Sequence, residues 1–229
     1  MNQIIHQRSI KFNLFALKTL ISVFISLYFM KFRIMKIIFI GISVLLTSFV
    51  FSQDKEVVLN NEEHIKLATH FLPENDKVEA RVLGYDGNGD IKVLRESDSY
   101  LTCVADDPKK KGVQFVCYYT QLERFMQRGR DLKKGGKSIM EVREIRKKEI
   151  ESGELKFPKG QSMMYVFNGK VENINVNAGT VEEGTLRYVV YVPYGTQSST
   201  GLPLSPSAPG MPWLMEPGTH RAHIMISPK

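Results

Sequence analysis

The stretch Lys77–Val104, KVEARVLGYDGNGDIKVLRESDSYLTCV, indicates the fold class more clearly than any other part of the chain. Residues 77–83 and 91–95 read as strands, and they flank a segment rich in Gly, Asp and Asn at 84–90. This pattern is typical of a β-hairpin whose turn needs residues with positive φ. Residues 99–104 are expected to add a third strand, so this part of the chain predicts a small sheet.

Helical segments lie on both sides of these strands. The clearest is a capping box, Ser138-x-x-Glu141, in which each side chain accepts a hydrogen bond from the backbone N–H of the other residue. Apolar residues at helical spacing support two further helices. The predicted helices are residues 60–71 with Asn60 or Asn61 as cap, residues 118–127, and the segment from Ser138 to a stop at Gly153.

The rest of the chain contributes more strands and a long loop. Residues 163–167 and 186–192 read as buried strands, residues 193–212 as a Pro-, Gly- and Ser-rich loop, and residues 222–226 as a final short strand. No regular βαβ alternation appears, so the predicted class is α+β. We expect a single domain over residues 53–229, with a small, mostly antiparallel sheet, about three helices and one disulfide.

Residues 35–52 have the pattern of a cleaved secretory signal peptide. Lys36 supplies a short positive region, an apolar stretch follows, and Val50 and Ser52 are small enough for positions −3 and −1 of a signal peptidase site. No Cys lies near this junction, which argues against a lipid-anchored lipoprotein. The pattern predicts export to the periplasm or beyond.

Residues 1–34 allow two interpretations. The preferred one is an over-extended start, with translation beginning at Met30 or Met35, because a complete signal begins at Met35 without help from upstream. The alternative is an extra hydrophobic segment: residues 10–30 are just long and apolar enough to cross a bilayer, which takes about 20 residues. The protein would then be membrane-anchored through residues 1–52. The intact mass of the exported product separates the two.

The charge distribution argues against a function in nucleic-acid binding. The chain has 31 Lys and Arg against 24 Asp and Glu, a formal charge of +7. Six of the basic residues and none of the acidic ones lie in residues 1–52, so the remainder is nearly balanced. Residues 124–148 hold ten basic and three acidic residues, which would suit phosphate-bearing ligands or an anionic membrane. A solvated helix face is the commoner outcome, and residues 129–148 contain no aromatic residue for base stacking.

Cys103 and Cys117 are the only cysteines. In an exported protein such a pair predicts a disulfide, and here it would join the end of the third strand to the start of the following helix. A metal pair is less favoured, because neither Cys-x-x-Cys nor Cys-x-x-His is present. We expect a structural role.

Other candidate metal sites are weak. Asp86, Asn88 and Asp90 resemble the opening of a calcium loop, but Ile91 and Ser97 stand where an EF-hand needs Gly and Glu, so a polar turn is the better interpretation. His220 and His223 are three apart before a strand, where side chains at that spacing diverge. His64 and His70 fall on nearly opposite sides of a helix. The sequence therefore predicts no metal and no cofactor, although three histidines from distant segments stay an alternative.

The C-terminal sequence PWLMEPGTHRAHIMI, from Pro212 to Ile226, is similar to the corresponding motif of an uncharacterised family of small exported bacterial proteins. The preceding segments 163–169 and 188–193, and the Cys103–Cys117 region, share the resemblance. The family usually has an aromatic residue or proline at the positions of His220 and Arg221. The resemblance implies export and one compact domain, and it implies no reaction, substrate or cofactor.

Two roles are open for this ending. In the first, Trp213 packs in a core-closing corner and His223 donates a hydrogen bond to a loop carbonyl. In the second, Trp213, Met215 and His223 surround a small-ligand pocket bordered by the 193–212 loop. The sequence has no Gly-x-Ser-x-Gly, His-Glu-x-x-His or phosphate-loop motif.

The preferred function is a non-catalytic binding or cell-envelope-associated module. Its partner would be an unknown small molecule or an envelope component, and no nucleic acid. A membrane would be contacted only through an uncleaved N-terminal segment. The alternative is a small exported hydrolase or metal-dependent enzyme, using His223 with a carboxylate such as Glu216 or one from the 84–90 hairpin.

Overall fold

The computed structural model describes Met30 and residues 59–228. The chain divides into one unit ending at Val57 and a second beginning at Val58, and the second unit is the one described below. The predicted signal peptide and the segment 1–34 lie outside the described residues, apart from Met30. Among the described residues, no helix is long and apolar enough to span a membrane.

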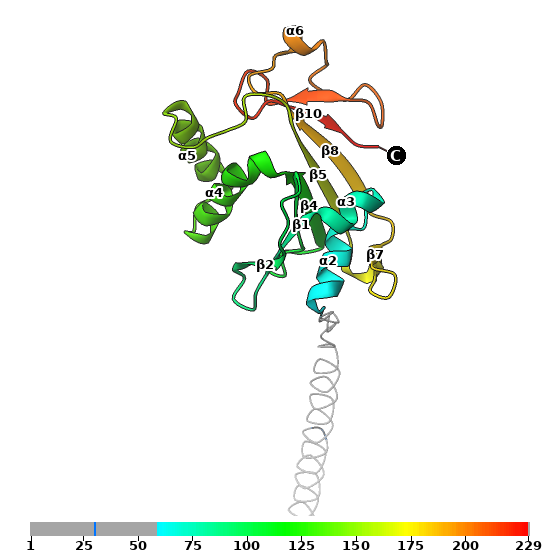
Figure 1. The fold of residues 1–229 in the computed structure, drawn as a ribbon. Coiled ribbons are helices and arrows are strands. Elements are labelled where there is room, and N and C mark those ends of the chain that lie inside the picture. The colour runs from blue at the N-terminus through cyan, green and yellow to red at the C-terminus, as the bar shows by residue number, and fades with distance from the viewer. Residues whose placement is uncertain (1–29, 31–58, 229) are drawn as a thin grey trace, which may run out of the picture. The chain divides into compact units, whose positions relative to one another are not determined.

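Helices and strands alternate irregularly along this unit (Figure 1). In chain order the elements are α2 (Asn61–Thr69), α3 (Glu74–Glu79), β1 (Arg81–Tyr85), β2 (Ile91–Arg95), β3 (Leu101–Val104), β4 (Val113–Tyr119), the 3-10 turn η1 (Thr120–Leu122), α4 (Glu123–Lys134), α5 (Ile139–Glu151), β5 (Ser162–Gly169), the 3-10 turn η2 (Val171–Asn173), β6 (Ile174–Asn175), β7 (Thr180–Val181), β8 (Thr185–Tyr191), α6 (Gln197–Thr200), β9 (Trp213–Met215) and β10 (His223–Ile226).

Eight of the strands form one mixed sheet, in the order β2-β1-β3-β4-β5-β8-β10-β9. Only the β1–β3 pair is parallel, and the other neighbours are antiparallel. Strands β6 and β7 pair separately as a short ribbon. The α+β class is confirmed, and the sheet is larger than the small one predicted.

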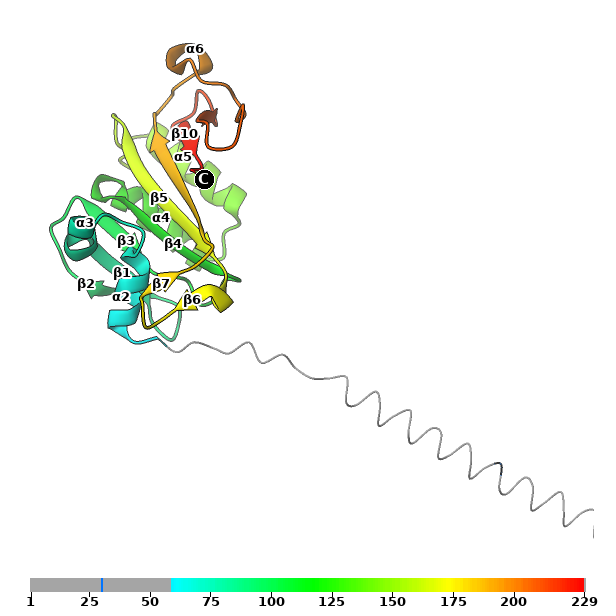
Figure 2. The same ribbon diagram turned by 90° about the vertical axis from the view of Figure 1, so that its right-hand side faces the viewer.

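The two faces of the sheet are covered by different helices (Figure 2). On one face, α2 packs over a core that includes Val82, Phe115 and Phe167. On the other face, Leu122 of η1 and Met126 of α4 pack with Leu83, Tyr118 and Tyr191. Because successive side chains of a strand point to opposite faces, both sides of the central strands are buried. In β4, Phe115 and Cys117 belong to the core under α2, whereas the neighbouring Tyr118 belongs to the core under η1 and α4.

Strand β4 corrects the expectation that a helix begins at Tyr118. Val113–Tyr119 pairs with β3 on one side and β5 on the other, and the helix starts only at Glu123, after η1. The apolar spacing of Leu122, Phe125 and Met126 is helical as predicted. The predicted N-terminal boundary of this helix is too early, because Tyr118 and Tyr119 of the strand fit the same apolar spacing.

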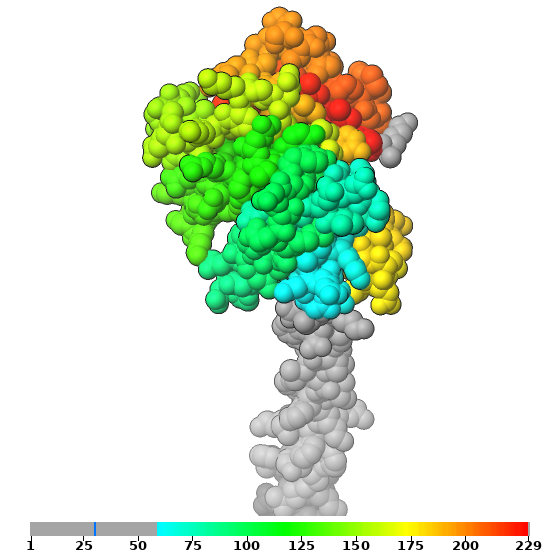
Figure 3. Space-filling model, in the orientation of Figure 1, coloured from blue at the N-terminus to red at the C-terminus, as the bar shows by residue number. Residues whose placement is uncertain are grey.

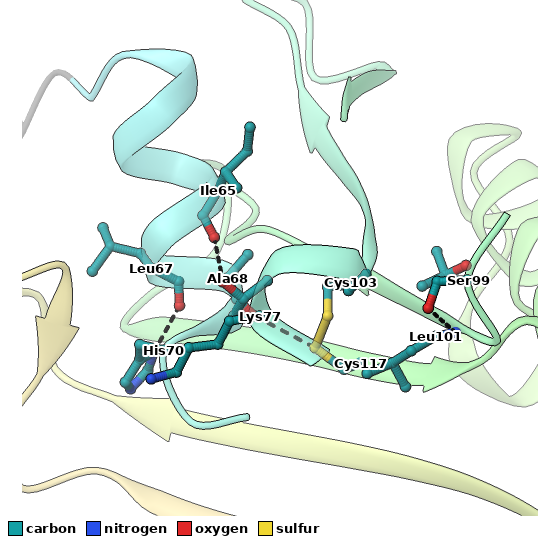
Figure 4. The surroundings of a disulfide bond; sticks show 12 residues. Ile65, Leu67, Ala68, His70, Lys77, Ser99, Leu101, Cys103 and Cys117 are labelled. Carbon is teal, nitrogen blue, oxygen red and sulfur yellow. Dashed lines mark hydrogen bonds between the residues drawn. A yellow bond between two sulfur atoms is a disulfide. The ribbon is translucent and has the colours of Figure 1, made fainter. Parts of the chain in front are cut away.

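The disulfide forms as predicted, but its position differs from the expected one. Cys103 and Cys117 are directly opposite each other on β3 and β4 and are completely buried. The bond therefore joins two neighbouring strands, and not a strand to a helix. Figure 4 shows it beneath α2, where the Cys117 sulfur lies 3.5 Å from the carbonyl oxygen of Ala68.

Local signals in the sequence account for several element boundaries. The predicted capping box of Ser138 with Glu141 is present at α5, and Asn60 is the cap of α2, where it forms a further capping box with Glu63. The 84–90 segment is the expected polar turn, because one carboxylate oxygen of Asp86 accepts hydrogen bonds from the backbone N–H of Asn88 and Asp90. The predicted first strand starts too early, since residues 77–79 belong to α3, whose N-cap is a proline.

Candidate functional site

A groove lies between the β1–β2 hairpin and α4. Its volume is about 970 Å³, and the space-filling view shows an opening between these elements (Figure 3). The hairpin, α4 and the loop before β4 each contribute to its walls. The lining residues are Arg81, Leu83, Tyr85, Asn88, Gly89, Asp90, Ile91, Val93, Asp107, Lys109, Lys110, Glu123, Gln127, Arg130, Asp131, Lys133 and Lys134.

The floor of the groove is apolar. Leu83 and Tyr85 of β1 are paired in register with Val93 and Ile91 of β2, so the four side chains lie on one face of the sheet. Leu83 is buried, whereas the exposed fraction of Val93 is 42%. The apolar floor therefore opens toward β2, which is an edge strand of the sheet.

A partly buried polar network supports the α4 wall. The Tyr118 hydroxyl donates to Glu123 Oε2 at 2.6 Å, and Arg130 Nη2 donates to Glu123 Oε1 at 2.6 Å. Arg130 Nη1 lies 3.2 Å from the Tyr118 oxygen. Burial raises the pKa of Tyr118, so its phenol stays protonated and donates to the carboxylate. This network fixes α4 at the orientation that forms the wall.

The rim carries several ion pairs, and two of its lysines, Lys109 and Lys133, form none within the described part of the chain; Lys109 Nζ donates to the carbonyl oxygen of Asn88. Lys134 Nζ lies 2.6 Å from Asp90 Oδ1, and Lys110 Nζ lies 3.5 Å from Asp107 Oδ2. Among the described residues, no carboxylate lies within 4 Å of Lys133 Nζ. Burial, and then the charge of Lys110, lowers the pKa of Lys133. An acidic group on a ligand would relieve that repulsion.

The groove has no metal-binding arrangement. Within the part of the chain that the structure describes, no group of three or more His, Cys, Asp or Glu side chains is placed to hold a metal ion. Asp86 is engaged by backbone N–H groups of its own turn, and Asp90 by Lys134. The carboxylates of this turn, which resembles the opening of a calcium loop, thus take part in turn hydrogen bonds and an ion pair.

The residues singled out from the C-terminal motif lie elsewhere. Trp213 and Met215 are on β9, and His223 is on β10, directly opposite Met215. These strands form the edge of the sheet opposite to β2, so none of the three residues lines the groove. Trp213 is half-buried, Met215 is exposed and His223 is buried.

The chain around His223 forms a tightly hydrogen-bonded corner. His223 Nδ1 lies 2.7 Å from the carbonyl oxygen of Arg221, and its ring packs at 5.7 Å from that of Tyr191. The turn before β10 is bonded to the segment after β8 by Tyr194 N–H to the Thr219 carbonyl and by Gly218 N–H to the Gly195 carbonyl. These contacts hold the turn before β10 against the segment that follows β8.

Four histidines give stability a pH dependence. Burial lowers the pKa of His64, His70, His220 and His223 below the ordinary value of about 6.5. The folded chain keeps them neutral while the unfolded chain takes up protons, so their stabilisation is present above pH 6.5 and is lost as the pH falls. We therefore expect the free energy of unfolding, measured by urea unfolding, to decrease from pH 7 to pH 5.5.

A matched variant isolates one histidine. The variant His223→Asn keeps a donor for the Arg221 carbonyl but has no titrating ring, so the free energy of unfolding should depend less on pH. If the free energy of unfolding depends on pH equally in His223→Asn and in wild type, His223 does not contribute to this dependence.

Asp106 acts in the opposite direction. Burial raises the pKa of Asp106 to about 6, so its contribution to stability is lost as the pH rises.

Comparison of the chain with protein-family models, curated proteins and solved structures found no match. The groove is therefore defined by its geometry alone, and its lining includes Asn88 and Asp90 of the turn that was compared above with a calcium loop. Sequence reasoning treated residues 124–148 as a solvated surface and missed the groove. One available signal was the spacing of Glu123 and Arg130, two helical turns apart and thus on one face of α4.

Proposed function

We propose that this chain is an exported, non-catalytic binding protein whose ligand site is the groove between the β1–β2 hairpin and α4. Export is supported by the signal-like segment 35–52 and by the buried disulfide, a bond typical of oxidising compartments. The resemblance of the C-terminal motif to a family of small exported bacterial proteins points the same way. The function itself depends on the groove.

The groove carries the proposal because it combines an apolar floor with a charged rim. Its volume lies at the upper end of the range of about 300–1,000 Å³ typical of small-molecule sites. Leu83, Tyr85, Ile91 and Val93 would cover an apolar body of the ligand. Lys133 would neutralise an acidic group at the rim. The ligand class that fits is a small amphipathic molecule with a carboxylate, sulfonate or phosphate.

An aromatic sulfonate, 8-anilinonaphthalene-1-sulfonate, tests this chemistry directly, because its fluorescence rises in apolar surroundings. We expect saturable binding to the folded protein. Val93→Asp places a negative charge on the floor and should weaken binding roughly tenfold or more. Lys133→Met removes the rim cation and should weaken it by a smaller factor, roughly threefold to tenfold.

The matched control is Val78→Asp. Val78 is more exposed than Val93 and lies on α3, outside the groove lining. Its replacement makes the same chemical change and should leave binding of the sulfonate within twofold of wild type. Equal weakening by both aspartate variants, or an unaffected Val93→Asp, would contradict the groove assignment.

The alternative function, a small exported hydrolase or metal-dependent enzyme around His223, retains one supporting observation. The contact of His223 Nδ1 with the Arg221 carbonyl places the proton on Nδ1, and burial lowers the pKa of the ring. The other ring nitrogen is then unprotonated, as a general base requires. Hydrolysis of a chromogenic ester that disappears in folded His223→Asn would favour this alternative over binding alone.

A further inference from the structure

Three arginines meet at the corner formed by α5 and the turn between β9 and β10. Arg143 and Arg146 come from α5, and Arg221 comes from the turn. One carboxylate, Glu216, lies among them, with Arg221 Nη1 at 3.1 Å and Arg143 Nη2 at 4.0 Å. Glu216 has a positive φ of 52°. The corner is separate from the groove, whose lining includes none of these residues.

Three buried nitrogens at this corner have no hydrogen-bond partner in the part of the chain that the structure describes. Among the described residues, Arg146 Nε, Arg221 Nε and His220 Nε2 are buried without a hydrogen-bond partner. His220 is only 5% exposed, and its ring packs against Phe125 and Phe157 at 6.2 and 5.9 Å. Buried polar atoms normally find partners. The two unpaired guanidinium N–H groups, Arg146 Nε–H and Arg221 Nε–H, therefore point to a ligand with acceptor oxygens.

The guanidinium groups of Arg143, Arg146 and Arg221 outnumber the carboxylates that pair with them. Arg146 stacks 3.9 Å over the Phe125 ring and donates through Nη1 to the Phe125 carbonyl oxygen, a neutral acceptor. Burial, together with the charges of Arg221 and Arg143, lowers the pKa of Arg146 to about 10. Glu149, another nearby carboxylate, is held bidentately by Arg128. Arg143 and Arg221 share Glu216, and among the described residues no carboxylate lies within 4 Å of Arg146. The three guanidinium groups and Glu216 together carry a net charge of +2.

We propose that this corner, made by Arg143, Arg146, Arg221 and His220, binds the phosphate group of a ligand. A phosphate dianion matches the two excess charges, and its three or four oxygens can accept from several guanidinium N–H groups at once. A single carboxylate would balance only one of the charges. Glu216 already supplies such a group and engages Arg221 through Nη1 alone.

The carboxylate of Glu216 would compete with an incoming anion for Arg143 and Arg221, because it already pairs with both. The side chains of Arg143 and Glu216 are 43% and 29% exposed, whereas that of Arg221 is 15% exposed. Arg143 and Glu216 are therefore the more accessible members of the corner, and Arg221 is the more buried one. Removing the charge of Glu216 should strengthen phosphate binding, which a merely structural ion pair would not predict.

The test is binding of inorganic phosphate to the whole protein at pH 8 and constant ionic strength, measured by calorimetry and thermal stability. Arg143→Met should weaken binding roughly tenfold or more. Its matched control is Lys147→Met, one turn further along α5 on an exposed side chain, which should stay within twofold. Glu216→Gln should tighten binding roughly tenfold. Both Arg143 and Glu216 are partly exposed, so these variants are expected to fold.

Two further ligands define the chemistry. At pH 5.5 phosphate is mostly a monoanion and should bind less tightly than at pH 8, whereas sulfate keeps both charges and should bind at both. Phenyl phosphate binding more tightly than inorganic phosphate would identify a phosphomonoester ligand, and its exclusion would identify the free ion. The proposal is overturned if phosphate has no effect beyond that of chloride, if Lys147→Met weakens binding as much as Arg143→Met, or if Glu216→Gln fails to strengthen it.

Discussion

Replacing Cys103 and Cys117 together with alanine is expected to lower the free energy of unfolding by at least about 3 kcal/mol. The bond closes a loop between residues 14 apart in the chain, and in the chain-entropy model such a loop restricts the unfolded state by about that amount. Both side chains are completely buried beneath α2, so the lost contacts add to the cost. Domains of this size are typically stable by only about 5–15 kcal/mol.

Urea unfolding of the double variant, compared with reduced and oxidised wild type, measures this effect. We expect the variant to remain folded, because β3 and β4 are paired over four residues and β4 pairs again with β5. Reduced wild type should lie between the oxidised protein and the alanine variant, since it keeps the sulfur atoms in the core. Equal stability of all three forms would show that the bond does not constrain the unfolded chain.

Local signals in the sequence account for much of the fold. The Ser138–Glu141 capping box, the Asn60 cap, the 84–90 turn and the C-terminal strand depend on residues close together in the chain, and each is found near its predicted position. The missed elements depend on distant partners. Strand β4 is a strand because β3 and β5 lie on either side of it, and β9 is a strand because β10 pairs with it between two prolines.

The candidate sites were less accessible to sequence reasoning for the same reason. The groove joins β1, β2, the segment before β4 and α4, and no spacing within one segment reveals that they meet. The excess of basic residues in 124–148 was visible. The sequence did not show that these basic residues belong to two different sites. Arg130 supports the groove wall, whereas Arg143 and Arg146 lie near Arg221, which is far along the chain. That meeting depends on the β9–β10 turn packing against α5.

Phe125→Ala is expected to have the second large effect on stability, a loss of about 3–5 kcal/mol. Phe125 is 1% exposed, and its ring contacts the rings of Phe157 and Tyr191 at 4.7 and 6.4 Å. Alanine would leave a cavity between α4 and the sheet and would remove the stacking surface of Arg146. Phe125→Leu keeps most of the volume and should cost less than about 2 kcal/mol, as measured by urea unfolding.

The leucine variant also connects this core position to the arginine corner. Because the Phe125 ring holds the Arg146 guanidinium at 3.9 Å, Phe125→Leu should leave Arg146 less ordered and weaken phosphate binding roughly threefold to tenfold. The matched control is Phe71→Leu, which disrupts an aromatic stack with Phe167 on the opposite face of the sheet. It should lower stability while leaving phosphate affinity unchanged. Parallel losses of affinity in both variants would mean that general loosening of the core, and not the position of Arg146, controls the anion site.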